Sequence, residues 1–281
     1  MTDEPRPPVE SFHEANREVV RALRSPEGKV RDLAIAEASP IVDDELAREL
    51  LRFARDPDHG EVERGDALIA LGPALEICSY DEADDGSLPD PAPEQEDWWD
   101  LPLSSAAYRE VTEALRRLYL DASMPKLVRR RALEAAVRAP RDWQRDAAGS
   151  AWRSADPEWR LTAVFAMGHL PGFAAEIERA LDDEELPIAR EALLAAGRAG
   201  VEDLGERLME VAADRHAERE LRLAAIEGLG ELGPEEAVEV LEGLTLDSDR
   251  EIAEAAEEAL EELQLLSGVG EDLDPGFDWE E

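Results

Sequence analysis

The chain has a single cysteine and no long apolar run among its 281 residues. Cys78 alone can form neither an internal disulfide nor a metal site built from several cysteines, so we interpret it as a small apolar residue at the end of a helix. A membrane-spanning helix needs about 18 consecutive apolar residues, and no such stretch occurs. The start, residues 1–8, is acidic and proline-rich without an apolar segment, so we expect a cytoplasmic protein.

Lysine is also scarce, because Lys29 and Lys126 are the only two. The chain carries 69 Asp and Glu against 30 Lys and Arg, a net charge of −39. This charge opposes binding to nucleic acid and to anionic membranes. It fits attraction to a basic partner, but a preference for Arg over Lys is also typical of proteins adapted to molar salt. We therefore expect a halophilic source, in whose cytoplasm the Debye length is about 3 Å at about 1 M salt.

Motifs for catalysis are missing as well. The sequence contains four histidines, and no Ser-His-Asp set, phosphate-binding loop or metal-ligand spacing can be recognised in it. We expect a protein that is not an enzyme and that binds no cofactor.

A repeated pattern is what the sequence does contain. Residues Arg222 to Gly233 read RLAAIEGLGELG, and Arg160 to Pro171 read RLTAVFAMGHLP. In both, Ala stands three residues after the Arg, a small residue six after it and Gly eight after it. Small residues on one face let a neighbouring helix approach closely, and we expect the late Gly to weaken or end the helix.

The alanine of this pattern recurs along the chain. It occupies positions Ala34, Ala67, Ala132, Ala163, Ala192, Ala225 and Ala256. The intervals are 33, 65, 31, 29, 33 and 31 residues, so the second interval holds one repeat and an insertion of similar length. The spacing predicts seven helix-turn-helix units.

These copies resemble HEAT repeats, specifically the short Ala/Gly-rich type first described in phycobilisome lyases, over nearly all of residues 10–265. The resemblance implies an all-α fold, a right-handed α-solenoid of about seven HEAT-like helical hairpins over residues 10–266. The second helix of each hairpin should line the concave side. Residues 1–9 are expected to be a disordered N-terminus, and residues 267–281 an acidic tail.

Some protein families built from similar repeats have enzymatic activity. Deoxyhypusine hydroxylases bind two irons through His-Glu pairs on several repeats, whereas this chain has only His13-Glu14. DNA glycosylases of HEAT-like fold depend on a basic groove, which the net charge opposes. No residue here can be assigned a role in handling bilins, and the resemblance to bilin lyases ends with the repeat itself. A lyase-like or maturation factor acting on a protein-bound cofactor remains the alternative to a non-catalytic protein.

Prolines and capping residues predict where helices begin and end. Ser25-Pro26-Glu27 and Asp156-Pro157-Glu158 have a capping residue, a proline and an acid in the order that favours a helix start. A helix is predicted over residues 64–78. Residues 79–104 contain four prolines and an acidic run, and we expect an inserted loop there.

Two aromatic segments have alternative interpretations. Trp98 and Trp99, within the inserted loop, either fold back over the seam between repeats or form an exposed anchor for another protein. Phe277 and Trp279, among the acids of the tail, either resemble a short peptide ligand or belong to an ordinary chain end.

One region departs from the acidic trend. Residues 109–160 hold twelve basic and eight acidic residues. A helix after Pro125 is expected to bury Val128, Ala132, Ala135 and Ala136, which leaves Arg130, Arg131 and Arg138 on other faces. Together with Trp143 these arginines form a candidate contact surface. Alternatively, they pair with Glu134, Asp142, Asp146 or acids of adjacent repeats, as exposed charges usually do.

Trp143 and Trp152 stand nine residues apart on one predicted helix and face nearly opposite sides, so at least one should lie in a core. We expect a monomeric scaffold or adaptor that binds another protein and that binds neither nucleic acid nor membrane. The basic surface implies a partner with acidic contact residues. Arg130, Arg131, Arg138 and Trp143 are the first candidate residues, and Trp98 and Trp99 the next.

Overall fold

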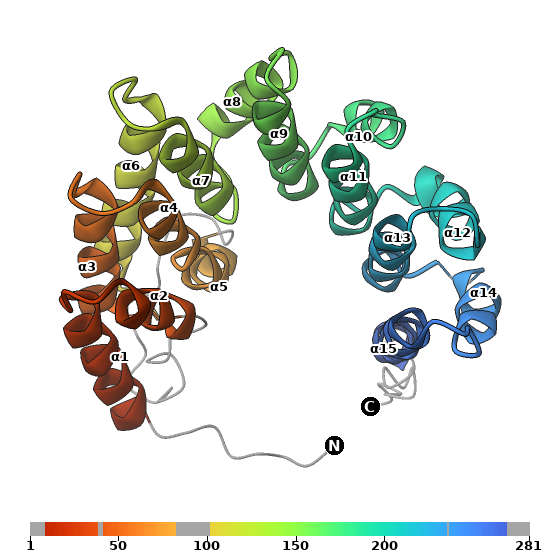
Figure 1. Cartoon of the computed structure of the whole chain (residues 1–281), viewed down its shortest axis with the longest axis horizontal. Coiled ribbons are helices and arrows are strands. Elements are labelled where there is room, and N and C mark those ends of the chain that lie inside the picture. Colours follow the sequence, from red (N-terminus) through yellow and green to blue (C-terminus); the bar gives the residue numbers. More distant parts are fainter. Residues whose placement is uncertain (1–8, 39–41, 83–101, 235, 269–281) are drawn as a thin grey trace, which may run out of the picture. The chain divides into compact units, whose positions relative to one another are not determined.

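The computed structural model describes residues 9–38, 42–82, 102–234 and 236–268. The chain divides into two compact units, residues 1–147 (unit 1) and 148–281 (unit 2). Helices with short connections account for the regular structure in both units, and no strand occurs in the described ranges (Figure 1). The prediction of an all-α solenoid of helical hairpins is confirmed.

Unit 1 contains three hairpins, an additional helix and the start of a fourth pair. Its helices are α1 (Val9–Leu23), α2 (Gly28–Glu37), α3 (Asp44–Arg55), α4 (Glu61–Ile69), α5 (Gly72–Glu82), α6 (Ser105–Leu120), α7 (Lys126–Ala136) and the larger part of α8 (Asp142–Trp152). α1 pairs with α2, α3 with α4 and α6 with α7, and the second helices α2, α4 and α7 also pack in sequence.

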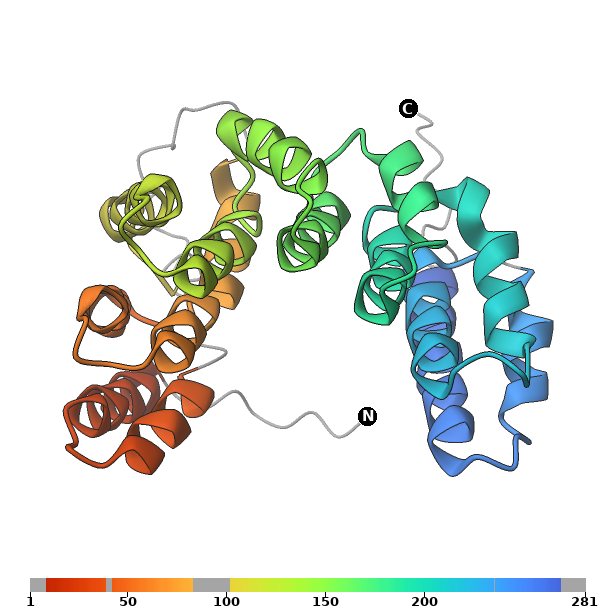
Figure 2. The same ribbon diagram turned by 45° about the horizontal axis from the view of Figure 1, so that its top comes forward.

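Unit 2 continues the same alternation. Its helices are α9 (Pro157–His169), α10 (Ala174–Ala180), α11 (Leu186–Arg198), α12 (Gly205–Ala213), α13 (Arg219–Leu232), α14 (Ala237–Leu244) and α15 (Arg250–Gly268), with a short 3-10 turn at Glu202–Leu204. The second helices α9, α11, α13 and α15 form one layer, and α10, α12 and α14 form the other (Figures 1 and 2). No described helix is long and apolar enough to cross a membrane.

The seven recurring alanines, which we call the column alanines, form the core of the repeat. Each of the seven predicted alanines lies on the second helix of a hairpin, and each is at most 2% exposed. A methyl group is small enough for the flanking second helices to pack closely around it. The sequence period therefore identified both the number of hairpins and their buried position.

A repeated arginine joins the two helices of a hairpin through a hydrogen bond. In three hairpins the arginine three residues before the column alanine donates from Nε to a carbonyl near the end of the first helix. The pairs are Arg64 with Ala54 at 2.8 Å, Arg129 with Tyr119 at 2.9 Å and Arg222 with Ala212 at 3.0 Å. Carbonyls at a helix C-terminus have no partner within the helix, so this cation satisfies one of them. The sequence showed the recurring arginine, but its role emerged only from the structure.

One predicted helix start is confirmed and another is displaced. α9 begins at Pro157, and the carboxylate of Asp156 accepts the N–H of Glu158 at 3.0 Å. α2 begins only at Gly28, with Glu27 as the residue before its first turn, although the Ser25 hydroxyl accepts the N–H of Glu27 as Asp156 does for Glu158. That bond forms a turn ahead of the helix.

The helix predicted over residues 64–78 is wrong in one respect. α4 ends at Ile69 and α5 starts at Gly72. Pro73 has no N–H, and its ring would clash with the carbonyl of Ile69 in a continuous helix. α5 then continues to Glu82, so the first residues of the predicted loop are helical. Residues 83–101, including Trp98 and Trp99, lie outside the described residues, and the two interpretations of that pair stay predictions.

The late glycines of the repeat do not end their helices. Gly168 and Gly230 both lie within helices, and α13 ends only at Gly233, whose φ of 72° is left-handed. They allow the next second helix to pack closely. A Cβ on Gly168 would lie only 3.1 Å from Cα of Ala195 on α11, so a larger residue would crowd that helix. The predicted close approach is confirmed, and the predicted helix ending is not.

Candidate protein-binding surface

The predicted basic surface lies on α7 and is largely paired. Arg130 is only 8% exposed, and its Nη2 is 3.9 Å from the Glu134 carboxylate. Arg131 donates from Nη1 to the same carboxylate at 2.7 Å. Val128 is buried as predicted, but Arg130 and Glu134, expected on other faces, are buried too. α7 contacts both α4 and α6, so its buried face is wider than one apolar stripe.

Arg138 bridges neighbouring hairpins. Its Nη1 is 2.5 Å from Oε2 of Glu76 on α5, and its side chain is 30% exposed. A Cβ on Gly72 would lie 2.7 Å from Cδ of Arg138, and one on Gly65 would lie 2.9 Å from Cγ of Arg131. Both arginine stems therefore fill space that glycines leave open on the adjacent helices. The structure shows the local pairing that was the alternative to a contact surface, while the binding role of these residues stays a prediction.

The tryptophans of this region contribute to packing. Trp143 is partly buried against the core of unit 1, and its ring centroid is 5.5 Å from that of Tyr119. Trp152 and Trp159 are partly buried against the core of unit 2. α8 therefore contributes a tryptophan to the core of each unit. Phe277 and Trp279 fall outside the described residues.

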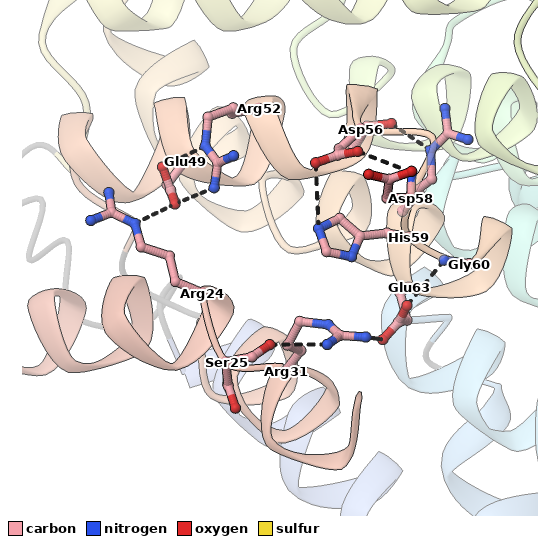
Figure 3. A network of polar contacts seen from close by, with 12 residues as sticks. Arg24, Ser25, Arg31, Glu49, Arg52, Asp56, Asp58, His59, Gly60 and Glu63 are labelled. Atoms are coloured by element: carbon pink, nitrogen blue, oxygen red, sulfur yellow. Dashed lines mark hydrogen bonds and ion pairs between the residues drawn. The ribbon is translucent and has the colours of Figure 1, made fainter. Parts of the chain in front are cut away.

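A second set of charges in unit 1 is also committed to structure (Figure 3). The buried carboxylate of Glu49 accepts hydrogen bonds from Arg52 at 2.7 Å and from Arg24 at 2.9 Å. The hydrogen bond from Arg52, with that from Arg24, lowers the pKa of Glu49 to about 2 against the opposing effect of burial. Arg31 joins α2 to α4 by donating to Glu63 at 2.7 Å. These groups hold hairpins together.

Unit 2 presents a different arrangement on its second helices. Arg198 of α11 donates to Glu191 at 2.5 Å, and its guanidinium carbon lies 5.1 Å from the ring centroid of Phe165 on α9. Its Nη1 is 3.4 Å from Nε2 of His169. An arginine can only donate, so His169 can form a hydrogen bond here only as an acceptor at Nε2. We call Phe165, His169, Glu191 and Arg198 the Arg198 cluster.

The repeat explains how this cluster arises. His169, Arg198 and Glu231 directly follow Gly168, Gly197 and Gly230, the glycines at which the second helices approach one another. A Cβ on Gly197 would lie 2.6 Å from the carbonyl oxygen of Gly228, so α11 and α13 meet backbone to backbone. Successive helices this close bring the side chains after the glycines into one row. The sequence analysis missed this row, although the position after each late Gly was its signal.

The row ends in carboxylates. Burial raises the pKa of Glu231 to about 7, and the charges of Glu227, Glu262 and Glu191 raise it further against the opposing effect of Arg198. The side chain of Glu262 lies beside Gly230, because a Cβ there would be 2.5 Å from its Oε2. The exposed face of the second helices thus changes from an aromatic-arginine cluster on α9 and α11 to acids on α13 and α15.

A groove lies beside the Arg198 cluster, between the loops that follow α9 and α11. It has a volume of about 550 Å³ and is formed by residues 168–174 and 198–203, which we call the loop groove. Leu170, Phe173 and Val201 supply apolar walls, and His169 and Arg198 lie on its rim. Gly172 and Gly200 line it with left-handed φ values of 87° and 61°. Gly200 has nothing within 4 Å of where a Cβ would stand.

This surface combines an arginine with aromatic side chains. Arginine and aromatic side chains dominate binding energy in protein interfaces, and a rigid row of them can receive a partner without rearrangement. Among the described residues, no group of three or more His, Cys, Asp or Glu side chains is arranged to hold a metal ion.

Comparison with known proteins agrees with the repeat architecture. No curated protein sequence matches the chain. Human deoxyhypusine hydroxylase in complex with glycerol is 15% identical, covers 93% of each chain and has a TM-score of 0.41. The E. coli protein YibA is 14% identical over 91% of this chain and 96% of its own, with a TM-score of 0.45. Both values are too low to indicate a shared function. Residues 173–261 match the family model of HEAT repeats.

Proposed function

We propose that this protein is a non-catalytic scaffold or adaptor, and that the exposed face of second helices α9, α11, α13 and α15 in unit 2 contacts a partner protein. The observation that supports this most is the Arg198 cluster. Its arginine is 19% exposed and is fixed by Glu191, His169 and the ring of Phe165. A side chain already held in one conformation loses little entropy on binding.

The rigidity of the row supports the same function. Gly197 faces Gly228 at a distance that leaves no room for a Cβ, and a Cβ on Gly168 or Gly230 would lie 3.1 or 3.2 Å from Cα of Ala195 or Ala259. Helices in such contact cannot slide without steric conflict. The partner would therefore meet a preformed surface with an arginine-aromatic end and an acidic end.

The experiment that tests this proposal is affinity capture from the source lysate at its native salt concentration. The variant F165A/R198A removes the aromatic ring and the guanidinium from the second-helix face. The control R179A/V238A removes a guanidinium and an aliphatic side chain from first helices, since Arg179 on α10 is 62% exposed and Val238 on α14 is 37% exposed. We expect the first variant to lose a protein that the control and the intact chain retain.

A third variant, R131E/R138E, tests the surface of unit 1 while leaving buried Arg130 unchanged. Loss of the same protein would place the contact on α7, as first predicted. If all variants retain the same partners, neither surface is a binding site. A pigment or cofactor that copurifies with a retained protein would instead favour a lyase-like or maturation factor. Such a function would fit the resemblance of the repeats to the short type found in phycobilisome lyases.

We also propose a halophilic source as the cause of the net charge of −39. At about 0.1 M salt, carboxylates repel one another over about 10 Å, against about 3 Å at 1 M. We expect the melting temperature to fall when salt is lowered over this range. Equal melting temperatures in both conditions would contradict the proposal.

A further inference from the structure

We propose that the acidic aromatic tail, residues 269–281, docks in the loop groove of unit 2 and covers the Arg198 cluster until a partner displaces it. This inference builds on the proposed binding surface. It commits to the chain's own tail as the occupant of the groove.

The composition of the tail matches what the groove offers. Phe277 and Trp279 flank Asp278, and Glu280 follows. An aromatic ring would contact the apolar walls of Phe173 and Val201, while a neighbouring carboxylate would meet Arg198 on the rim. A guanidinium has five N–H donors. Of the described residues, Glu191 and His169 are the hydrogen-bonding partners of Arg198, so donors remain for a further carboxylate.

The tail begins at the end of α15, near the edge of unit 2 that holds the loop groove. Gly197 faces Glu231, and Gly230 faces Glu262, so the late residues of successive second helices lie beside one another. α11 therefore ends beside the end of α13, and α13 ends beside Glu262, six residues before the end of α15 at Gly268. The loop groove is lined by residues at the ends of α9 and α11 and in the loops that follow them.

The tail is also long enough. Packed helices are about 8–10 Å apart, so the step from α15 past α13 to α11 spans roughly 20 Å. Phe277 follows the last residue of α15, Gly268, by nine positions, which reach about 30 Å when extended at about 3.3 Å per residue. Glu231 and Glu262 lie along this path and repel the acids of the tail, so docking should strengthen at about 1 M salt, where the Debye length is about 3 Å.

The test uses the full chain and a labelled synthetic peptide of residues 269–281. In the variant F277A/W279A the groove should be vacant, whereas in the unmodified chain the tail competes with the peptide. We expect fluorescence anisotropy at about 1 M salt, a concentration that screens the acidic path, to show the peptide binding the variant at least ten-fold more tightly than the unmodified chain.

A groove-filling change and a matched control locate the site. Ala199 is exposed, lines the groove and has ordinary helical φ and ψ, so A199W placed in the F277A/W279A chain should abolish peptide binding. G243W in the same chain adds a tryptophan where nothing lies within 4 Å, and it should leave binding unchanged. Equal affinity for the two starting chains, no binding to F277A/W279A, or no effect of A199W would overturn the proposal. Because no partner protein is involved, the proposal can fail while partner capture succeeds.

Discussion

The two units use the small residues of the same repeat in different ways. In unit 1, Gly65 and Gly72 leave space that the stems of Arg131 and Arg138 fill, and the guanidinium groups pair with Glu134 and Glu76. In unit 2, glycines admit the neighbouring backbone itself: Gly197 and Gly228 bring α11 and α13 into direct contact. These glycines thus receive arginine stems from a neighbouring helix in unit 1 and the neighbouring main chain in unit 2, where ion pairs such as Arg222 with Asp247 also join hairpins.

This difference teaches how one repeat can support two kinds of surface. Where arginine stems cross between helices, their charges are used in holding hairpins together. Where backbones touch, no long side chain is needed at the seam, and the side chain of Arg198 stays partly exposed. Unit 2 should therefore be more sensitive than unit 1 to volume added at these glycines.

The largest effect should come from closing the space between α11 and α13. A Cβ on Gly197 would lie 2.6 Å from the carbonyl oxygen of Gly228, and main-chain atoms cannot move aside cheaply. We expect G197A to lower the free energy of unfolding by about 3 kcal/mol, measured by urea denaturation. The control G243A, on the open side of α14, should be neutral or stabilising by up to about 1 kcal/mol. If G197A leaves the free energy of unfolding unchanged, the glycines of unit 2 are not more sensitive to added volume than those of unit 1.

Removing a hairpin-closing arginine should rank next. Arg222 is 7% exposed, donates to the carbonyl of Ala212 and pairs with Asp247 at 2.8 Å. R222A leaves a buried carbonyl and a carboxylate unpaired, so we expect a loss of about 2–3 kcal/mol. The exposed pair of Arg250 with Glu254 provides the control, because R250A should cost under about 0.5 kcal/mol. Arg64 makes the matching bond to the carbonyl of Ala54 in unit 1, so R64A should lower the free energy of unfolding by about as much as R222A. A large difference between the two losses would show that the arginine-to-carbonyl bond does not have the same role in both units.

The two units should respond oppositely to pH at one carboxylate each. The lowered pKa of Glu49, about 2 against 4.5, stabilises the fold above pH 4.5, and this contribution disappears as pH falls toward 2. The raised pKa of Glu231, about 7, means that ionisation destabilises the fold increasingly from pH 4.5 to 7 and fully above pH 7. E49Q should therefore cost about 1–2 kcal/mol at pH 7, a discounted value because its arginine partners are exposed.

E231Q should have the opposite sign, with stability raised at pH 8 and unchanged near pH 4. Melting temperatures measured from pH 3 to pH 8 check both variants. Parallel curves for E231Q and the unmodified chain would show that Glu231 is not perturbed by its neighbours.

The smallest effect is expected at Gly72. An added Cβ there would meet Cδ of Arg138, a flexible side chain that can shift, rather than a neighbouring backbone. G72A should change stability by less than about 1 kcal/mol, and R138A should lose about 0.5 kcal/mol, as is usual for a partly exposed ion pair. A loss of 3 kcal/mol or more in G72A, the value expected for G197A, would remove the distinction between the units.

Much of the fold was predictable because the repeat depends on local spacing. The seven column alanines indicated the hairpins, since only a small side chain fits where second helices meet, and Asp156-Pro157 indicated the start of α9. The break at Pro73 was missed because apolar residues continue through it. Close approach of helices at the small residues was predictable from the same pattern, whereas the exact helix ends, at His169 and Leu232, lie one and two residues beyond the late glycines.

The candidate surface was less predictable for a related reason. Arg130 and Arg138 stand out in an acidic sequence, but whether an arginine is free or paired depends on helices distant in the chain, such as Glu76 of α5 for Arg138. The Arg198 cluster combines residues from α9 and α11 that no local pattern connects. Only the repeat register, read at the residue after each late glycine, places His169, Arg198 and Glu231 in one row.

The most direct test of the central claim is hydrogen exchange on the chain alone and in complex with a protein captured by it at native salt. If the face of second helices binds the partner, amide protection should increase on α9, α11, α13 and α15 and stay unchanged on α10, α12 and α14. Protection confined to the first helices, or to unit 1, would contradict the account.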